Sequence, residues 1–192
     1  MFNKQFSLLI VTLFLSASAT VLASGIMSEQ DVDAVSRVNI TDEDKISKVA
    51  GLLAQYEIEA HKLIASLSKP DLTANQLNQQ AQQLLSLSES LIKSARFRLP
   101  QCANYLDETL KLKANLATIS NEKLESDYHH DAALPTAPVE CYHTKDLFVH
   151  PATVIVLGRE DPSLMQKTKT AIEAEIAEVL GHTDIVRQVV IY

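Results

Sequence analysis

Tryptophan is absent from this 192-residue sequence, and only four glycines occur in it. Proteins made of many short strands need frequent glycine-containing turns, so this scarcity disfavours a turn-rich sheet protein. A chain this poor in glycine also has no glycine-rich loop that could cradle a phosphate. Helix-forming residues such as Leu, Ala, Gln, Glu and Lys are abundant instead. The sequence therefore predicts a mostly α-helical protein.

Several catalytic and cofactor motifs are missing as well. The sequence contains no C-x-x-C-H, which excludes ordinary covalent attachment of a c-type haem. It contains no G-x-S-x-G, the turn that presents a catalytic serine in α/β-hydrolases. Methionine, one common axial ligand of haem, occurs after the first 23 residues only at Met27 and Met165. We assign no catalytic residue from the sequence.

Long apolar runs are also scarce, and the clearest one lies at residues 6–15. Lys4 precedes it and small residues follow it up to Ala23, which is the pattern of a secretory signal peptide. The run is short for a membrane span. The residue directly after Ala23 is Ser24 and not a cysteine that could carry a lipid. We therefore expect an exported, periplasmic protein without membrane insertion. The expected division is a signal peptide at 1–23, a polar lead-in at 24–40 and a single helical-bundle domain at 41–192.

The charge balance is acidic, with a formal net charge of −7. Removal of the signal peptide would take away Lys4 and no acid, which makes the mature chain one unit more negative. Nucleic acids and anionic membranes both attract clustered positive charge, so neither is an expected partner. An unidentified protein or a small ligand is the expected partner instead.

Apolar residues recur at three- and four-residue spacing in three segments, which predicts three helices of about 25 residues each. Thr73 and Gln76 form a capping box at the second of them. The proline that follows Leu99 ends it, because a residue before proline avoids helical geometry. The three predicted helices run from Thr41 to Lys69, from Thr73 to Leu99 and from Cys102 to about Ser126.

A fourth helix is predicted over Pro162–Leu180, with Asp161 as its cap and Gly181 as its end. The β-branched runs at 153–156 and 189–191 fit either strand or helix. Helix is favoured, because an isolated two-stranded pair is only marginally stable. The predicted fold is an up-and-down helical bundle of about four helices, with a long crossover before the last helix.

Most residues capable of chemistry gather between Tyr128 and Leu157, within this expected crossover. Two cysteines in an exported chain indicate one disulfide, Cys102 to Cys141, which would tether the crossover to the third helix.

Four of the six histidines lie in the same segment. Imidazole is a good ligand for copper and zinc, so these side chains are candidate metal ligands. Their spacing matches no compact zinc motif, and histidines of a solvated loop remain the commoner interpretation. The candidate ligands are His129, His130, His143 and His150.

Two Glu and His pairs stand four residues apart, Glu57 with His61 and Glu178 with His182. Each pair lies on one helix face and is able to chelate an ion. The spacing departs from the Glu-x-x-His pairs of di-iron bundles, and residues at the edge of an apolar stripe are commonly solvated. We leave both pairs out of the predicted site.

The aromatic residues Tyr128, Tyr142 and Phe148 form a candidate surface for a partner protein or ligand, or else fasten the crossover to the core. The favoured hypothesis is a non-enzymatic periplasmic binding or accessory protein. A copper- or zinc-binding protein that uses the crossover histidines is the first alternative. A thiol-dependent enzyme centred on Cys141 is the second, and it requires a free thiol.

Overall fold

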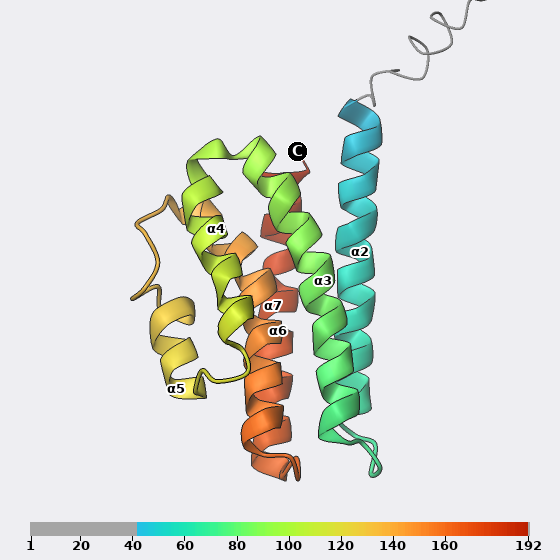
Figure 1. The fold of residues 1–192 in the computed structure, drawn as a ribbon. Coiled ribbons are helices and arrows are strands. Elements are labelled where there is room, and N and C mark those ends of the chain that lie inside the picture. The colour runs from blue at the N-terminus through green and yellow to red at the C-terminus, as the bar shows by residue number, and fades with distance from the viewer. Residues whose placement is uncertain (1–41, 192) are drawn as a thin grey trace, which may run out of the picture. The chain divides into compact units, whose positions relative to one another are not determined.

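A computed structural model describes residues 42–191, and the predicted signal peptide and lead-in lie outside this range. The described part is mostly helical and contains no β-strand, which confirms the prediction of a mostly α-helical protein (Figure 1). Its four longest helices are α2 (Asp42–Ser66), α3 (Ala74–Arg98), α6 (Tyr142–Glu160) and α7 (Gln166–Val190). Helices α3 and α7 each pack on both α2 and α6, so the four helices enclose a common core.

The first two long helices follow the sequence pattern. Helix α2 buries Leu53, Tyr56 and Leu63 on the face that the apolar spacing predicts. At the start of α3 the Thr73 hydroxyl accepts a hydrogen bond from the Gln76 backbone N–H, and the Gln76 side chain accepts one from the Thr73 N–H. The predicted capping box is therefore confirmed.

The third predicted helix, from Cys102 to Ser126, is wrong as a continuous element. The Ser120 hydroxyl accepts a hydrogen bond from the Lys123 N–H and so starts a new helix after a turn. The regular apolar spacing ends at Ile119, and only Leu124 is apolar between this turn and Ser126, so periodicity does not support a continuous helix there. The segment contains η1 (Pro100–Cys102), α4 (Ala103–Leu110), η2 (Lys111–Asn115), α5 (Asn121–Leu124) and the π-helical turn η3 (Glu125–His129).

The expected crossover up to Leu157 is also wrong, because most of it is helix α6. After the short turn η4 (Val139–Cys141), the chain enters α6, and every residue from Thr144 to Val156 is buried. A helix that is buried all round has no polar face and no amphipathic stripe. The sequence pattern that revealed the other helices is therefore missing from the most buried one.

Helix α6 contains a proline in its interior, Pro151. Proline has no backbone N–H, so the carbonyl four residues earlier loses its helical donor. That carbonyl belongs to Leu147, and the buried Tyr56 hydroxyl of α2 donates a hydrogen bond to it over 2.9 Å. The neighbouring helix thus supplies the hydrogen bond that the proline removes.

The last helix starts later and ends later than predicted. Its N-cap is Met165 and not the predicted Asp161. The Asp161 carboxylate still contacts this end of the helix, because it accepts hydrogen bonds from the Met165 N–H and the Thr168 hydroxyl. Gly181 is not a stop, since α7 continues through it to Val190. The favoured helical interpretation of 153–156 is confirmed.

Cys102 and Cys141 are both buried, and their sulfur atoms lie 2.10 Å apart, at disulfide distance. The pair joins the start of α4 to the start of α6 across a sequence separation of 39 residues. Across residues 42–191, the helices are all too short or too polar to cross a membrane.

Candidate metal centre

Helices α6 and α7 each carry three side chains of types that can ligate a metal, at positions i, i+3 and i+7. Residues with this spacing share one face of a helix. The two faces meet, because His150 Nδ1 lies 2.7 Å from Glu175 Oε2 and His182 Nδ1 lies 3.2 Å from Asp146 Oδ2. The two triplets are His143, Asp146 and His150 on α6, and Glu175, Glu178 and His182 on α7.

The turn η3 contributes one further histidine, His129, to the region where these two helix faces meet. Its His129 ring lies 4.9 Å from the His150 ring, with the two rings nearly perpendicular. His129 Nδ1 contacts Glu125 Oε2 at 2.7 Å, while its Nε2 lies 4.0 Å from Glu178 Oε1. The π-helical turn thereby brings one imidazole against two helices that follow it in the chain.

The first group of ligand atoms belongs to His129, His150 and Glu178, and these atoms lie within 4.8 Å of one another. In both histidines the Nδ1 atom is hydrogen-bonded to a carboxylate, that of Glu125 for His129 and that of Glu175 for His150. This leaves Nε2 as the available ligand atom of each ring. The His150 side chain is fully buried, and its Nε2 has no hydrogen-bond partner.

The second group belongs to His143, Asp146 and His182, whose ligand atoms also lie within 4.8 Å of one another. The Nδ1 atoms of both histidines are buried without a hydrogen-bond partner, and they lie 4.0 Å (His143) and 3.2 Å (His182) from Asp146 Oδ2. The two rings are 4.5 Å apart. We call the two groups together the histidine centre: His129, His143, Asp146, His150, Glu178 and His182. Another possible group, Glu125, His129 and Glu175, consists of His129 with the carboxylates around it.

A buried lysine lies beside the centre. The Lys145 ammonium donates hydrogen bonds to the His129 carbonyl over 2.8 Å and to Asp131 Oδ1 over 3.0 Å. It also lies 3.2 Å from Asp146 Oδ1. The Tyr105 hydroxyl donates to the same Asp131 oxygen, and burial together with this bond raises the Tyr105 pKa. These fixed contacts anchor the segment after η3 against α6.

Two imidazoles of the centre have shifted pKa values. Burial lowers the pKa of His129, but its hydrogen bond to Glu125 and the nearby carboxylates outweigh burial and raise the pKa overall. Burial is also the main influence on His182, where it lowers the pKa with help from His143 and His150, against the opposing charge of Asp146. The His182 ring therefore favours the neutral form that ligates metal ions.

Comparisons with known proteins add no assignment. No protein-family model, curated protein or solved structure matches this chain. Function is therefore inferred from the chemistry of the site, which is the proper basis for it in any fold.

Three of the four histidines predicted as ligands come together, namely His129, His143 and His150. His130 is exposed and stacks on His129 at 5.2 Å between ring centroids, outside the three ligand groups. Asp146 is not among the predicted ligands, because the sequence predicts a crossover and not a helix at 142–150. The spacing His143, Asp146, His150 would have revealed a shared face had helical geometry been assumed.

The two Glu and His pairs have different surroundings. Glu178 and His182 both belong to the histidine centre, contrary to the expectation that they are solvated boundary residues. Glu57 instead accepts a hydrogen bond from Arg187 over 2.6 Å, and His61 is exposed on α2. Identical spacing thus has different consequences, because only α7 faces the ligands of α6.

The aromatic surface that the sequence predicts does not include Phe148, which is fully buried in the core. Tyr128 and Tyr142 are partly buried. The Tyr142 hydroxyl donates to the Ala137 carbonyl over 3.2 Å, and its ring lies 5.8 Å from that of Tyr105. These contacts fasten the connecting segment to the bundle.

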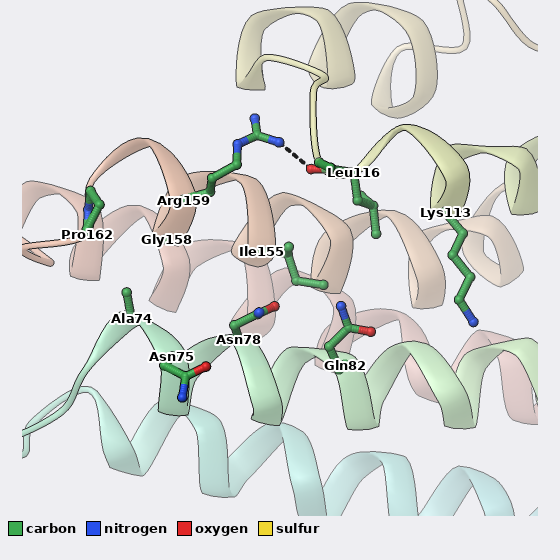
Figure 2. Close-up of a pocket in the computed structure, with 11 residues that line it drawn as sticks. Ala74, Asn75, Asn78, Gln82, Lys113, Leu116, Ile155, Gly158, Arg159 and Pro162 are labelled. Atoms are coloured by element: carbon green, nitrogen blue, oxygen red, sulfur yellow. Dashed lines mark hydrogen bonds between the residues drawn. The ribbon is translucent and has the colours of Figure 1, made fainter.

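A cleft of about 620 Å³ lies elsewhere, between α3, the C-terminal half of α6 and the segment around η2 (Figure 2). Its two cations are already engaged: Arg159 donates to the Leu116 and Ile119 carbonyls, and Lys113 pairs with Glu89. The remaining polar side chains are the exposed amides of Asn75, Asn78 and Gln82. Neutral exposed amides give little reason to expect a specific ligand, so the histidine centre is the better candidate site.

Proposed function

We propose that this protein binds a divalent transition metal ion, zinc or copper, in the histidine centre. The proposal adopts the first alternative from the sequence, a copper- or zinc-binding protein, in place of the favoured hypothesis, which named no ligand. It draws on the ligand type, because imidazole nitrogen suits zinc and copper, whereas calcium and magnesium take oxygen ligands.

The observation that carries the proposal is the pair of histidines with outer carboxylates. Metal-ligating histidines usually donate their second ring N–H to a carboxylate or carbonyl, which fixes the tautomer and aims the other nitrogen at the ion. His129 with Glu125 and His150 with Glu175 both have this arrangement, each at 2.7 Å. Glu178 adds the carboxylate of a two-histidine, one-carboxylate ligand set.

Zinc titration of the metal-free protein tests the proposal. We expect the wild type to bind with a dissociation constant below about 1 μM. A quadruple variant should bind zinc more than about 100-fold more weakly. It carries His129→Gln, His143→Gln, His150→Gln and His182→Gln. His61→Gln is the control, because His61 is exposed and outside the centre. Absence of binding in the wild type, or full binding in the folded quadruple variant, would refute the proposal.

A milder substitution tests the outer carboxylates. Glu175→Gln removes the negative charge beside His150 Nδ1 while keeping the side-chain shape, and we expect it to weaken zinc binding by about 10- to 100-fold. Glu173→Gln, an exposed position on the same helix, is the matched control and should change little. Equal effects of both substitutions would show that Glu175 acts only through overall charge.

The thiol-enzyme alternative is disfavoured by the distance between the two sulfurs, because a disulfide leaves Cys141 without a thiol. We propose the periplasm as the location, since a disulfide persists in an oxidising compartment. Proteins of the periplasm also encounter zinc and copper ions.

A further inference from the structure

We propose that the histidine centre holds two metal ions side by side, one in each ligand group. This inference rests on the proposed function, because it specifies how many ions the same centre takes. The two groups share no residue: His129, His150 and Glu178 form the first, and His143, Asp146 and His182 form the second.

The two groups are neighbours along both helices. Asp146 and His150 are four residues apart on α6, and Glu178 and His182 are four apart on α7, so each helix contributes to both groups from successive turns. The rings of His150 and His182 meet edge to face across the boundary, with centroids 6.1 Å apart. Two ions bound here would therefore be adjacent.

Hydrogen bonding indicates that one ion is too few. Buried polar atoms are normally hydrogen-bonded. An ion held by the first group would satisfy the Nε2 of His150, the buried atom without a partner in that group. It would leave the buried Nδ1 atoms of His143 and His182 without partners. A second ion at these two nitrogens and the Asp146 carboxylate satisfies them.

The charge of the surroundings agrees with two divalent ions. Among residues 42–191, five carboxylates line or adjoin the centre, and the Lys145 ammonium lies among them. With neutral histidines, this leaves four negative charges, which two divalent cations neutralise. The five carboxylates are Glu125, Asp131, Asp146, Glu175 and Glu178. Asp131 and Asp146 lie beside the ammonium, so the first group has the larger negative excess.

Metal counting on defined variants tests the inference. Purified full-length protein is loaded with zinc, freed of excess metal and measured by mass spectrometry. We expect about two ions per chain in the wild type, since there are two ligand groups. His129→Gln with His150→Gln, and separately His143→Gln with His182→Gln, should each retain one ion. His61→Gln is the control and should retain two.

The outcomes separate the two proposals. No ion in the wild type overturns both of them. One ion in the wild type leaves the proposed function standing and overturns the two-ion inference. Two ions in either double variant also overturn it, because the ligand groups would then be wrong. If the variant of His143 and His182 fails to fold by circular dichroism, His143→Gln alone replaces it, since this side chain is 28% exposed. If the variant of His129 and His150 fails to fold, His129→Gln alone replaces it, since this side chain is 20% exposed.

Copper provides an independent readout of adjacency. Two neighbouring Cu²⁺ ions couple magnetically, so the electron paramagnetic resonance spectrum of the loaded wild type should be broadened and weaker than its copper content predicts. Each double variant should give the sharp, full-intensity spectrum of an isolated ion. A sharp, full-intensity spectrum from a wild type that contains two ions would contradict adjacent sites.

Discussion

His129 and His182 belong to the same histidine centre, yet their surroundings shift their pKa values in opposite directions. Burial opposes protonation of His129, but Glu125 on one ring nitrogen, together with Glu175 and Asp146, stabilises the protonated ring by more and raises its pKa. His182 has two other imidazoles beside it, and burial dominates. Two residues of the same type thus have different preferred charge states because of their contacts.

The metal-free protein should show this difference directly. In an NMR titration, His129 should titrate above 6.5 and His182 below it, 6.5 being the ordinary pKa of histidine. The stabilisation from His129 is present below about pH 6.5 and is lost as the pH rises through its raised pKa. That from His182 is present above about pH 6.5 and is lost as the pH falls through its lowered pKa.

Urea unfolding with a chelator present should therefore separate the two substitutions, with wild type as the reference. His129→Gln should reduce the free energy of unfolding more at about pH 5.5 than at about pH 8, and His182→Gln should do the reverse. The same pH dependence for both variants would contradict the assigned surroundings.

At the scale of the element, α6 decides where the site lies. It is buried from Thr144 to Val156 and interrupted by Pro151, yet it remains one helix. Its continuity depends on α2, because the Tyr56 hydroxyl supplies the donor that the Leu147 carbonyl lacks. His143 and His150 lie on either side of Leu147, so this bond helps to keep both ligands in one helical register.

A double-mutant cycle tests this compensation. Tyr56→Phe leaves the buried Leu147 carbonyl without a donor and should lower the free energy of unfolding by about 1–3 kcal/mol. In a Pro151→Ala background the new alanine N–H can donate to the same carbonyl, so Tyr56→Phe should then be less destabilising.

Urea unfolding of the four proteins of the cycle gives the comparison. Tyr142→Phe is the control, because its bond to the Ala137 carbonyl is partly exposed and involves no proline. If Tyr56→Phe has the same effect with proline and with alanine at position 151, the two residues do not compensate each other.

At the scale of the whole molecule, the cysteine pair links parts that the chain separates. Cys102 and Cys141 close a loop that contains α4, α5 and η3, and so contains His129. The second ligand group lies entirely on α6 and α7, outside that loop. The cysteine pair therefore constrains the position of His129, in the first ligand group, more than that of any residue in the second group.

Replacing both cysteines by serine should lower the free energy of unfolding by roughly 4 kcal/mol on the loop-entropy estimate. It should also weaken metal binding at the group that contains His129 more than at the group on α6 and α7. Urea unfolding and zinc titration measure the two effects. Two titratable thiols in the unfolded, unreduced wild type, or equal weakening of both groups, would contradict this account.

Some features of the fold were predictable because they are local. The spacing of Leu53, Tyr56 and Leu63 on α2 and the capping box of Thr73 depend only on near neighbours in the chain. The mostly helical class follows from composition and from these patterns. Three members of the histidine centre, His129, His143 and His150, were candidates from their residue type alone.

The remaining features depend on contacts between distant segments. A helix buried on all sides carries no amphipathic pattern, so α6 was mistaken for a crossover, and the shared face of His143, Asp146 and His150 was missed. The sequence also could not distinguish the surroundings of His182 from those of His61, since each follows a glutamate by four residues. The sequence by itself determined the helical class and the supply of ligands. Only the packing of α6, α7 and η3 decided which ligands meet, because a metal site requires atoms a few ångströms apart from segments distant in the chain.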